Sequence, residues 1–227
     1  MADDGARQCD TLLLTTGNFG RMTFRQRGQA DDVERPRHCL GRVARTAHHL
    51  VASWNAVAGM NARTLAQAFA QSADGERLEE VPEALLLAAQ LGANDEFSET
   101  QLEERLRQFH TEAYQLVHQA ADALDRRDFA TFGTVVARSQ AGAERALANQ
   151  IPETMYLAQQ ARVFGAVASS AFGAGFGGSV WAMVHVDEVE RFLARWRQQY
   201  VQAFPAAAYR AQFFSTIPSA PAFEMLE

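Results

Sequence analysis

The fold of this chain is decided by residues 169–182, which read Ser169-Ser170-Ala171-Phe172-Gly173-Ala174-Gly175-Phe176-Gly177-Gly178-Ser179-Val180-Trp181-Ala182. Four glycines stand within six residues, and an apolar run follows them. Clustered glycines cost conformational entropy, so the structure must need a backbone with positive φ or a close approach that a Cβ would prevent. A bound phosphate and a tightly packed neighbouring strand are the two common reasons.

Two short strands are predicted on either side of the glycines, over Ala166–Phe172 and Ser179–Val186. Together they indicate a hairpin, and the second strand is apolar on both faces, so we expect it to be central. Asp187 and Glu190 predict a following helix that a capping box opens. Its expected buried face is Val189, Phe192, Leu193, Trp196 and Tyr200. Gln212–Ile217 predicts a last strand.

The residues before the hairpin have the apolar period of helices. Helices are predicted over Gly41–Gly59, over a short segment with Leu65 and Phe69 that Asn61 would cap, and over Val81–Leu91, Glu99–Leu124, Asp128–Asn149 and Pro152–Val163. The clearest has one apolar face made of Leu102, Leu106, Phe109, Ala113, Leu116, Val117, Ala120 and Leu124. We therefore expect an α+β fold, a helical block packed on a small, mostly antiparallel sheet.

The domain organisation follows from the same patterns. Residues 1–38 contain one strand candidate, Thr11–Thr16, in an otherwise polar stretch, so we expect a weakly structured or non-native segment. Residues 39–227 then form the domain proper. Val163–Val184 is uncharged and long enough to span a bilayer, but its glycines and serines fit a hairpin better, so we expect no membrane segment.

Composition excludes several functions. The 227 residues carry a formal net charge of −6 and no basic run, which argues against a nucleic-acid or anionic-membrane partner. Cys9 and Cys39 form no ligand pair, and no signal-peptide pattern is present, so we expect a cytoplasmic location. All 21 basic residues are Arg. Without lysine, a Walker A loop, a protein-kinase strand lysine and a pyridoxal Schiff base are all excluded.

The histidines and one acidic run have simple explanations. His48, His49, His110 and His118 lack the spacing of a zinc site with an acidic third ligand, so we expect them on helix surfaces. The acidic run is Asp95, Glu96, Glu99, Glu103 and Glu104. It stands where the long helix begins, and the helix dipole accounts for it.

Gly173, Gly175 and Gly178 also fit the pattern G-x-G-x-x-G. A dinucleotide-binding loop would open a helix, whereas a strand is predicted to follow here. A protein-kinase glycine loop would need a lysine and an H-R-D string, and the chain has neither. A tight hairpin in a crowded sheet, without any ligand, stays open as an alternative.

The string from Ser170 to Val180 resembles the C-terminal glycine motif of the GHMP kinases, and of galactokinase-like members in particular. Other segments resemble the family in order and spacing over roughly residues 40–217. These are Arg42–Ala47, Asp128-Phe129-Ala130-Thr131-Phe132-Gly133, Ala137-Arg138-Ser139-Gln140 and Ile151-Pro152-Glu153-Thr154. Leu40 and Gly41 stand where the family has a sugar-contacting Tyr-Asn pair.

The resemblance implies a function. Galactokinase-like enzymes transfer the γ-phosphoryl group of ATP to a sugar hydroxyl in a cleft between two domains. Their N-terminal domain supplies the phosphate loop, the Mg²⁺-binding residues and a catalytic Asp, and no segment of this chain resembles them. We therefore expect the C-terminal half of such an ATP:sugar phosphotransferase, inactive alone, which a separate N-terminal half would complete. ATP and Mg²⁺ are the expected cofactors of the full enzyme, and a monosaccharide is its substrate.

The resemblance also implies site residues. They line the sugar and phosphate end of the cleft and are Gly173, Ala174, Gly175, Phe176, Gly177, Gly178, Ser179 and Ser139. No catalytic residue and no metal ligand is assigned within this chain. A non-catalytic module on the same scaffold, which binds a protein or senses a ligand, is the alternative function.

Overall fold

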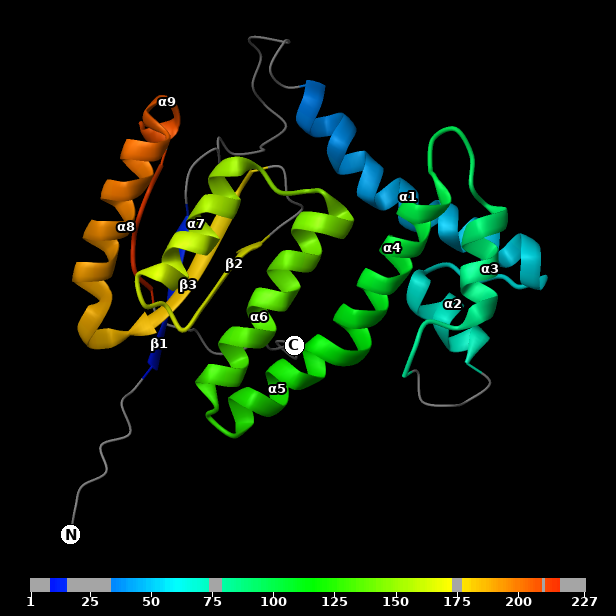
Figure 1. Cartoon of the computed structure of the whole chain (residues 1–227), viewed down its shortest axis with the longest axis horizontal. Helices are drawn as coiled ribbons and strands as arrows, with labels where there is room; N and C mark the ends of the chain where they lie inside the picture. Colours follow the sequence, from blue (N-terminus) through cyan, green and yellow to red (C-terminus); the bar gives the residue numbers. More distant parts are fainter. Residues whose placement is uncertain (1–8, 16–33, 74–78, 173–176, 210, 217–227) are drawn as a thin grey trace, which may run out of the picture. The chain divides into compact units, whose positions relative to one another are not determined.

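The structure is a computed structural model, and it describes residues 9–15, 34–73, 79–172, 177–209 and 211–216. The chain divides into two compact units, which we describe separately (Figure 1). The sheet unit comprises Met1–Arg25, Ile151–Gly173 and Gly177–Glu227. The helical unit comprises Gln26–Gln150 and Ala174–Phe176.

The sheet unit contains an antiparallel sheet of three described strands in the order β1-β3-β2. The strands are β1 (Cys9–Thr15), β2 (Ala168–Phe172) and β3 (Ser179–His185). β2 and β3 form the predicted hairpin, with Ala168 opposite Met183 and Phe172 opposite Ser179. β3 is central, which confirms the expectation from its apolar faces.

Helices cover one face of this sheet. They are α7 (Pro152–Val163), α8 (Val189–Ala203) and the short α9 (Pro205–Ala208). Val180, Ala182 and Val184 alternate along β3 and point to this face, since they share a core with both long helices. The other core members include Leu157 and Ala161 of α7 and Phe192, Trp196 and Tyr200 of α8. The predicted buried face of α8 is confirmed.

Two local predictions for this unit were wrong. The capping box of Asp187 and Glu190 does not form, because Val186–Glu188 make a 3₁₀ turn and α8 begins at Val189 without a side-chain cap. The predicted strand Gln212–Ile217 is also absent from its described part, residues 212–216. There the ring of Phe213 packs 5.6 Å from Trp196 and 5.8 Å from Tyr200, so apolar packing replaces strand pairing.

The helical unit begins with the long helix α1 (Glu34–Ala58), followed by α2 (Leu65–Ser72) and α3 (Glu83–Leu91). One continuous helical rod follows, made of α4 (Glu99–Thr111), the π-turn η1 (Glu112–Leu116) and α5 (Val117–Asp125). The last continuous helical segment of this unit consists of α6 (Phe129–Gly142) and a second π-turn, η2 (Ala143–Leu147). The helices predicted for this unit are thus all present, with shifted ends, whereas α7 of the sheet unit has its predicted bounds.

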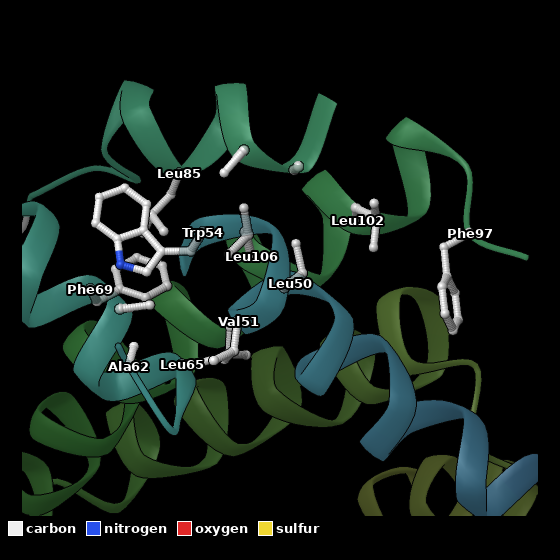
Figure 2. Close-up of a cluster of buried hydrophobic side chains, with 13 residues drawn as sticks. Leu50, Val51, Trp54, Ala62, Leu65, Phe69, Leu85, Phe97, Leu102 and Leu106 are labelled. Atoms are coloured by element: carbon white, nitrogen blue, oxygen red, sulfur yellow. The ribbon is translucent and has the colours of Figure 1, made fainter. Parts of the chain in front are cut away.

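The core of the helical unit lies between α1, α2, α3 and α4, as Figure 2 shows. Leu50, Val51 and Trp54 of α1 meet Phe69 of α2, Leu85 of α3, and Leu102 and Leu106 of α4. Leu102, Leu106 and Phe69 are fully buried. This cluster is separate from the core of the sheet unit, so each unit has its own apolar centre.

Two predictions for the helical unit need correction. Thr64, not Asn61, caps α2, since its hydroxyl accepts a hydrogen bond from Gln67 N at 3.2 Å. The apolar face of the long rod also changes direction after α4. Val117 is 55% and Leu124 43% exposed, whereas Ala123 is buried. The reason is η1, because a π-turn holds an extra residue and turns the following side chains to another side of the rod.

The predicted strand Thr11–Thr16 is present as β1. The boundary between a segment 1–38 and a domain 39–227 stays a prediction. None of the helices in the described ranges is both long and apolar enough to cross a membrane.

Candidate functional site

The candidate site begins at the end of the β2–β3 hairpin. Phe172 and Ser179 are the last paired residues, and the chain between them carries the glycine cluster. Gly173, Ala174, Gly175 and Phe176 lie outside the described residues. Gly177 and Gly178 are described, with φ of 108° and 119°. Side chains rarely allow such φ values, so these two positions require glycine.

Ser179 follows the glycines directly and is 7% exposed. It starts β3, so the hairpin fixes its backbone. The neighbouring hydroxyls in β2 are engaged locally: Ser169 Oγ donates to the carbonyl of Trp181 at 2.7 Å, and Ser170 Oγ to that of Ala171 at 2.9 Å. The Ser169 bond therefore joins β2 to β3, whereas this bond of Ser170 stays within β2.

Ser139 lies on α6, in the helical unit. Its hydroxyl donates a hydrogen bond to Glu112 Oε1 at 2.9 Å. Glu112 is the first residue of the π-turn η1, so this bond ties α6 to the neighbouring rod. π-turns occur frequently at functional sites. Gly177, Gly178 and Ser179 belong to the sheet unit and are therefore described separately from Ser139.

Two of the motif segments start helices. Asp128 caps α6, because Thr131 N donates to its Oδ1 at 3.0 Å and Thr131 Oγ1 to its Oδ2 at 2.6 Å. The side-chain bond from Thr131, followed by the backbone bond, lowers the pKa of Asp128 below its ordinary value. Pro152 occupies the first turn of α7, where a missing N–H costs nothing. These segments fix where the helices begin.

Sequence reasoning missed Glu112 and both π-turns. Glu112 stands in an unbroken helical pattern, 27 residues from its partner Ser139, so no local feature of the sequence marks the contact. The apolar residues of the sequence keep helical spacing through Glu112–Leu116, so no sequence signal marks this π-turn either.

The histidines differ in their surroundings. His48 and His118 are exposed, as expected, and His49 is half-buried with Nε2 2.6 Å from the carbonyl of Gly92. His110 contradicts the expectation of a surface position, since it is 4% exposed. Its ring stacks against Phe69 and also lies near Tyr114, because the core of the helical unit extends to this turn of α4.

The described residues contain no group of three His, Cys, Asp or Glu side chains that could hold a metal ion. Mg²⁺ coordination calls for several oxygen ligands around one point. The described residues therefore do not fit an Mg²⁺ site.

Comparison with known proteins gives the following. Residues 120–202 match the family described as GHMP kinases C terminal. The protein named "Putative galactokinase" from Treponema pallidum (strain Nichols) is 34% identical over 103 residues, which are 42% of this chain and 26% of that protein. The crystal structure of Lactococcus lactis galactokinase complexed with galactose superposes with a TM-score of 0.60 at 19% identity. That match covers 93% of this chain and 45% of the galactokinase.

The matched family region holds most of the candidate site. It contains α6, α7, β2, β3 and nearly all of α8, and all eight expected site residues fall inside it. The likeness to the solved structure shows a shared fold. In both pairwise comparisons, the chain spans less than half of the related protein.

Proposed function

We propose that this chain, whose residues 120–202 match the family of GHMP kinase C-terminal domains, is the C-terminal half of a galactokinase-like, ATP-dependent sugar kinase. The full enzyme would transfer the γ-phosphoryl group of ATP to a hydroxyl of a monosaccharide. We also propose that this chain is inactive until an N-terminal half completes it.

One observation carries the proposal. The family match over residues 120–202 includes the hairpin whose Gly177 and Gly178 take φ values that require glycine. Gly177 and Gly178 carry no side chain, so another backbone or a phosphate can approach the hairpin closely at these two residues. This property suits one wall of a cleft that holds a phosphorylated nucleotide and a sugar.

Phosphoryl transfer depends mainly on positioning and on cations that neutralise the migrating group. In the proposed enzyme this chain contributes positioning. The backbone at Gly177 and Gly178 shapes the wall, and Ser139 offers a hydroxyl whose direction Glu112 holds. Mg²⁺, the phosphate loop and the catalytic Asp would come from the N-terminal half.

The proposal is tested by reconstitution. The purified chain is assayed for ATP-dependent phosphorylation of a monosaccharide panel that includes galactose, alone and with a separately produced N-terminal half of a galactokinase. We expect no turnover with the chain alone and turnover with both halves. Robust turnover by the chain alone would contradict its role as an incomplete half. A stable complex of the two halves without turnover would overturn the kinase assignment.

Matched glycine variants separate function from stability. Gly177→Ala combined with Gly178→Ala should abolish turnover of the reconstituted enzyme. Gly59→Ala is the control, since Gly59 also has positive φ, 65°, but lies at the end of α1, where an added Cβ would have no atom within 4 Å. That variant should lose stability and keep its turnover. Binding of a protein partner without any nucleotide dependence would favour the non-catalytic alternative.

A further inference from the structure

Arg105 on α4 is a half-buried cation that the proposed kinase function does not use. Its Nη1 donates to Gln108 Oε1 at 2.7 Å, and its Cζ lies 5.9 Å from the centre of the Phe109 ring. Its Nε is enclosed by protein and bonds to no other group. Most of the hydrogen-bonding capacity of this guanidinium is therefore unused.

Arg105 also has no counter-ion among the residues that the structure describes. No carboxylate of these residues lies within 4.0 Å of it, whereas its neighbour Arg107 pairs with Glu103 at 3.6 Å. Burial lowers the pKa of Arg105. A partly desolvated charge without a partner destabilises a folded protein, so its presence calls for a reason.

The polar groups around Arg105 form a donor set. Arg offers N–H donors and no acceptor, so the Gln108 amide must turn its oxygen toward Nη1. The amide NH₂ of Gln108 does not bond to the guanidinium and adds two further donors. Arg105 Nη2 and Gln108 Nε2 thus both present N–H groups that no described residue accepts.

We propose that Arg105 and Gln108 form a binding site for a small oxyanion, a carboxylate or a phosphate. An oxyanion accepts hydrogen bonds from Nη2 and from the Gln108 amide, and its charge compensates the guanidinium. Neither residue belongs to the set expected in the kinase site, so this inference stands independently of the proposed function.

The test compares anions at constant ionic strength. Thermal unfolding of the full chain is followed in chloride while inorganic phosphate or succinate is titrated, so the two arms distinguish phosphate from carboxylate. We expect Tm to rise with at least one of them in a saturable manner. Arg105→Met should lose this rise, and Arg107→Met is the matched control that should keep it, because Arg107 is exposed and paired.

A second variant introduces a carboxylate into the chain itself, in place of a bound anion. Gln108→Glu places a carboxylate beside the guanidinium, so it should raise Tm in chloride and abolish the response to added anions. Three results would each overturn the proposal: no saturable response of the parent chain, an unchanged response in Arg105→Met, or an unchanged response in Gln108→Glu. The second variant keeps the test decisive even if Arg105→Met fails to fold.

Discussion

Gly92 lies directly against Ser53, because α1 and α3 approach each other closely at this point. A Cβ placed on Gly92 would stand 2.2 Å from Ser53 Oγ, 2.8 Å from Ser53 Cβ and 3.0 Å from the carbonyl oxygen of Ala88. The φ of Gly92 is −83°, which any residue can adopt. Glycine is therefore required here by space and not by backbone conformation.

We predict that Gly92→Ala destabilises the chain by about 1–3 kcal/mol, the usual cost of overpacking a close contact. Urea unfolding measures the effect. Gly142→Ala is the matched control, since its Cβ would meet just Gln108 Cγ at 3.8 Å, an ordinary contact. That variant should gain about 0.5–1 kcal/mol from helix propensity. Equal effects of the two variants would contradict the steric argument.

Gly165 ends α7 with a φ of 97°, and an added Cβ would have no atom within 4 Å. Here conformation and not space requires glycine, so we predict that Gly165→Ala costs about 1–2 kcal/mol. Ala148 provides the reverse test, because it has a φ of 47° and carries the Cβ that this region disfavours. Ala148→Gly should therefore be neutral or stabilising in the same urea experiment.

The fold could be predicted where local chemistry and apolar period agree. Asp128 and Pro152 mark the starts of α6 and α7, and both helices begin there. The apolar period gave wrong predictions where the backbone departs from regular α-helical geometry. The π-turn η1 turns Val117 and Leu124 outward, and the 3₁₀ turn at Val186–Glu188 displaces the start of α8. Neither departure has a signature in side-chain type.

In the candidate site, too, the local feature could be predicted from the sequence and the long-range contact could not. The glycine cluster identified the hairpin, because two adjacent positions with positive φ can hardly be filled by another residue. The contact between Ser139 and Glu112 joins residues far apart in sequence and depends on how two helical rods pack. Tertiary packing decides such a contact, and a single sequence does not reveal it.

Asp128 should make the stability of α6 depend on pH. Its pKa is lowered in the folded chain, mainly by the side-chain hydrogen bond from Thr131 and then by the backbone bond. A lowered folded pKa means that the stabilisation is present above the unfolded value, near 3.8, and is lost as pH falls through the folded value. We predict that Asp128→Ala is less stable than the parent chain at pH 7 and that the difference disappears well below pH 3.8.

Thr131→Val provides the control for this prediction. It removes the side-chain donor and leaves the backbone bond from Thr131 N to Asp128 Oδ1 in place. The variant should therefore show a smaller version of the same pH dependence in urea titrations. A stability difference between Asp128→Ala and the parent chain that stays constant from pH 7 to pH 3 would contradict the capping role.

The bond between Ser139 and Glu112 should contribute measurable coupling energy. Ser139→Ala and Glu112→Ala, singly and together, form a double-mutant cycle, since each substitution removes one partner of the bond. We predict a coupling of about 0.5–1.5 kcal/mol, typical of a partly buried hydrogen bond. The same cycle built on Arg126→Gln and Asp122→Asn, an exposed pair 3.6 Å apart, should give a coupling near zero. Coupling of equal size in both cycles would contradict a special role for Ser139 and Glu112.

The two separate cores should respond independently to mutation. Trp196 is fully buried in the sheet unit and its indole N–H donates to the carbonyl of Leu157 at 3.1 Å. Trp196→Phe removes volume and this bond, so we predict a loss of about 1–3 kcal/mol. Hydrogen exchange should then show faster opening of amides in β3 and α8, while those in α3 and α4 keep their protection.

Trp54→Phe, which removes the donor to Gln71 in the helical unit, should give the opposite pattern. Loss of protection in both units from either variant would show that the cores unfold together.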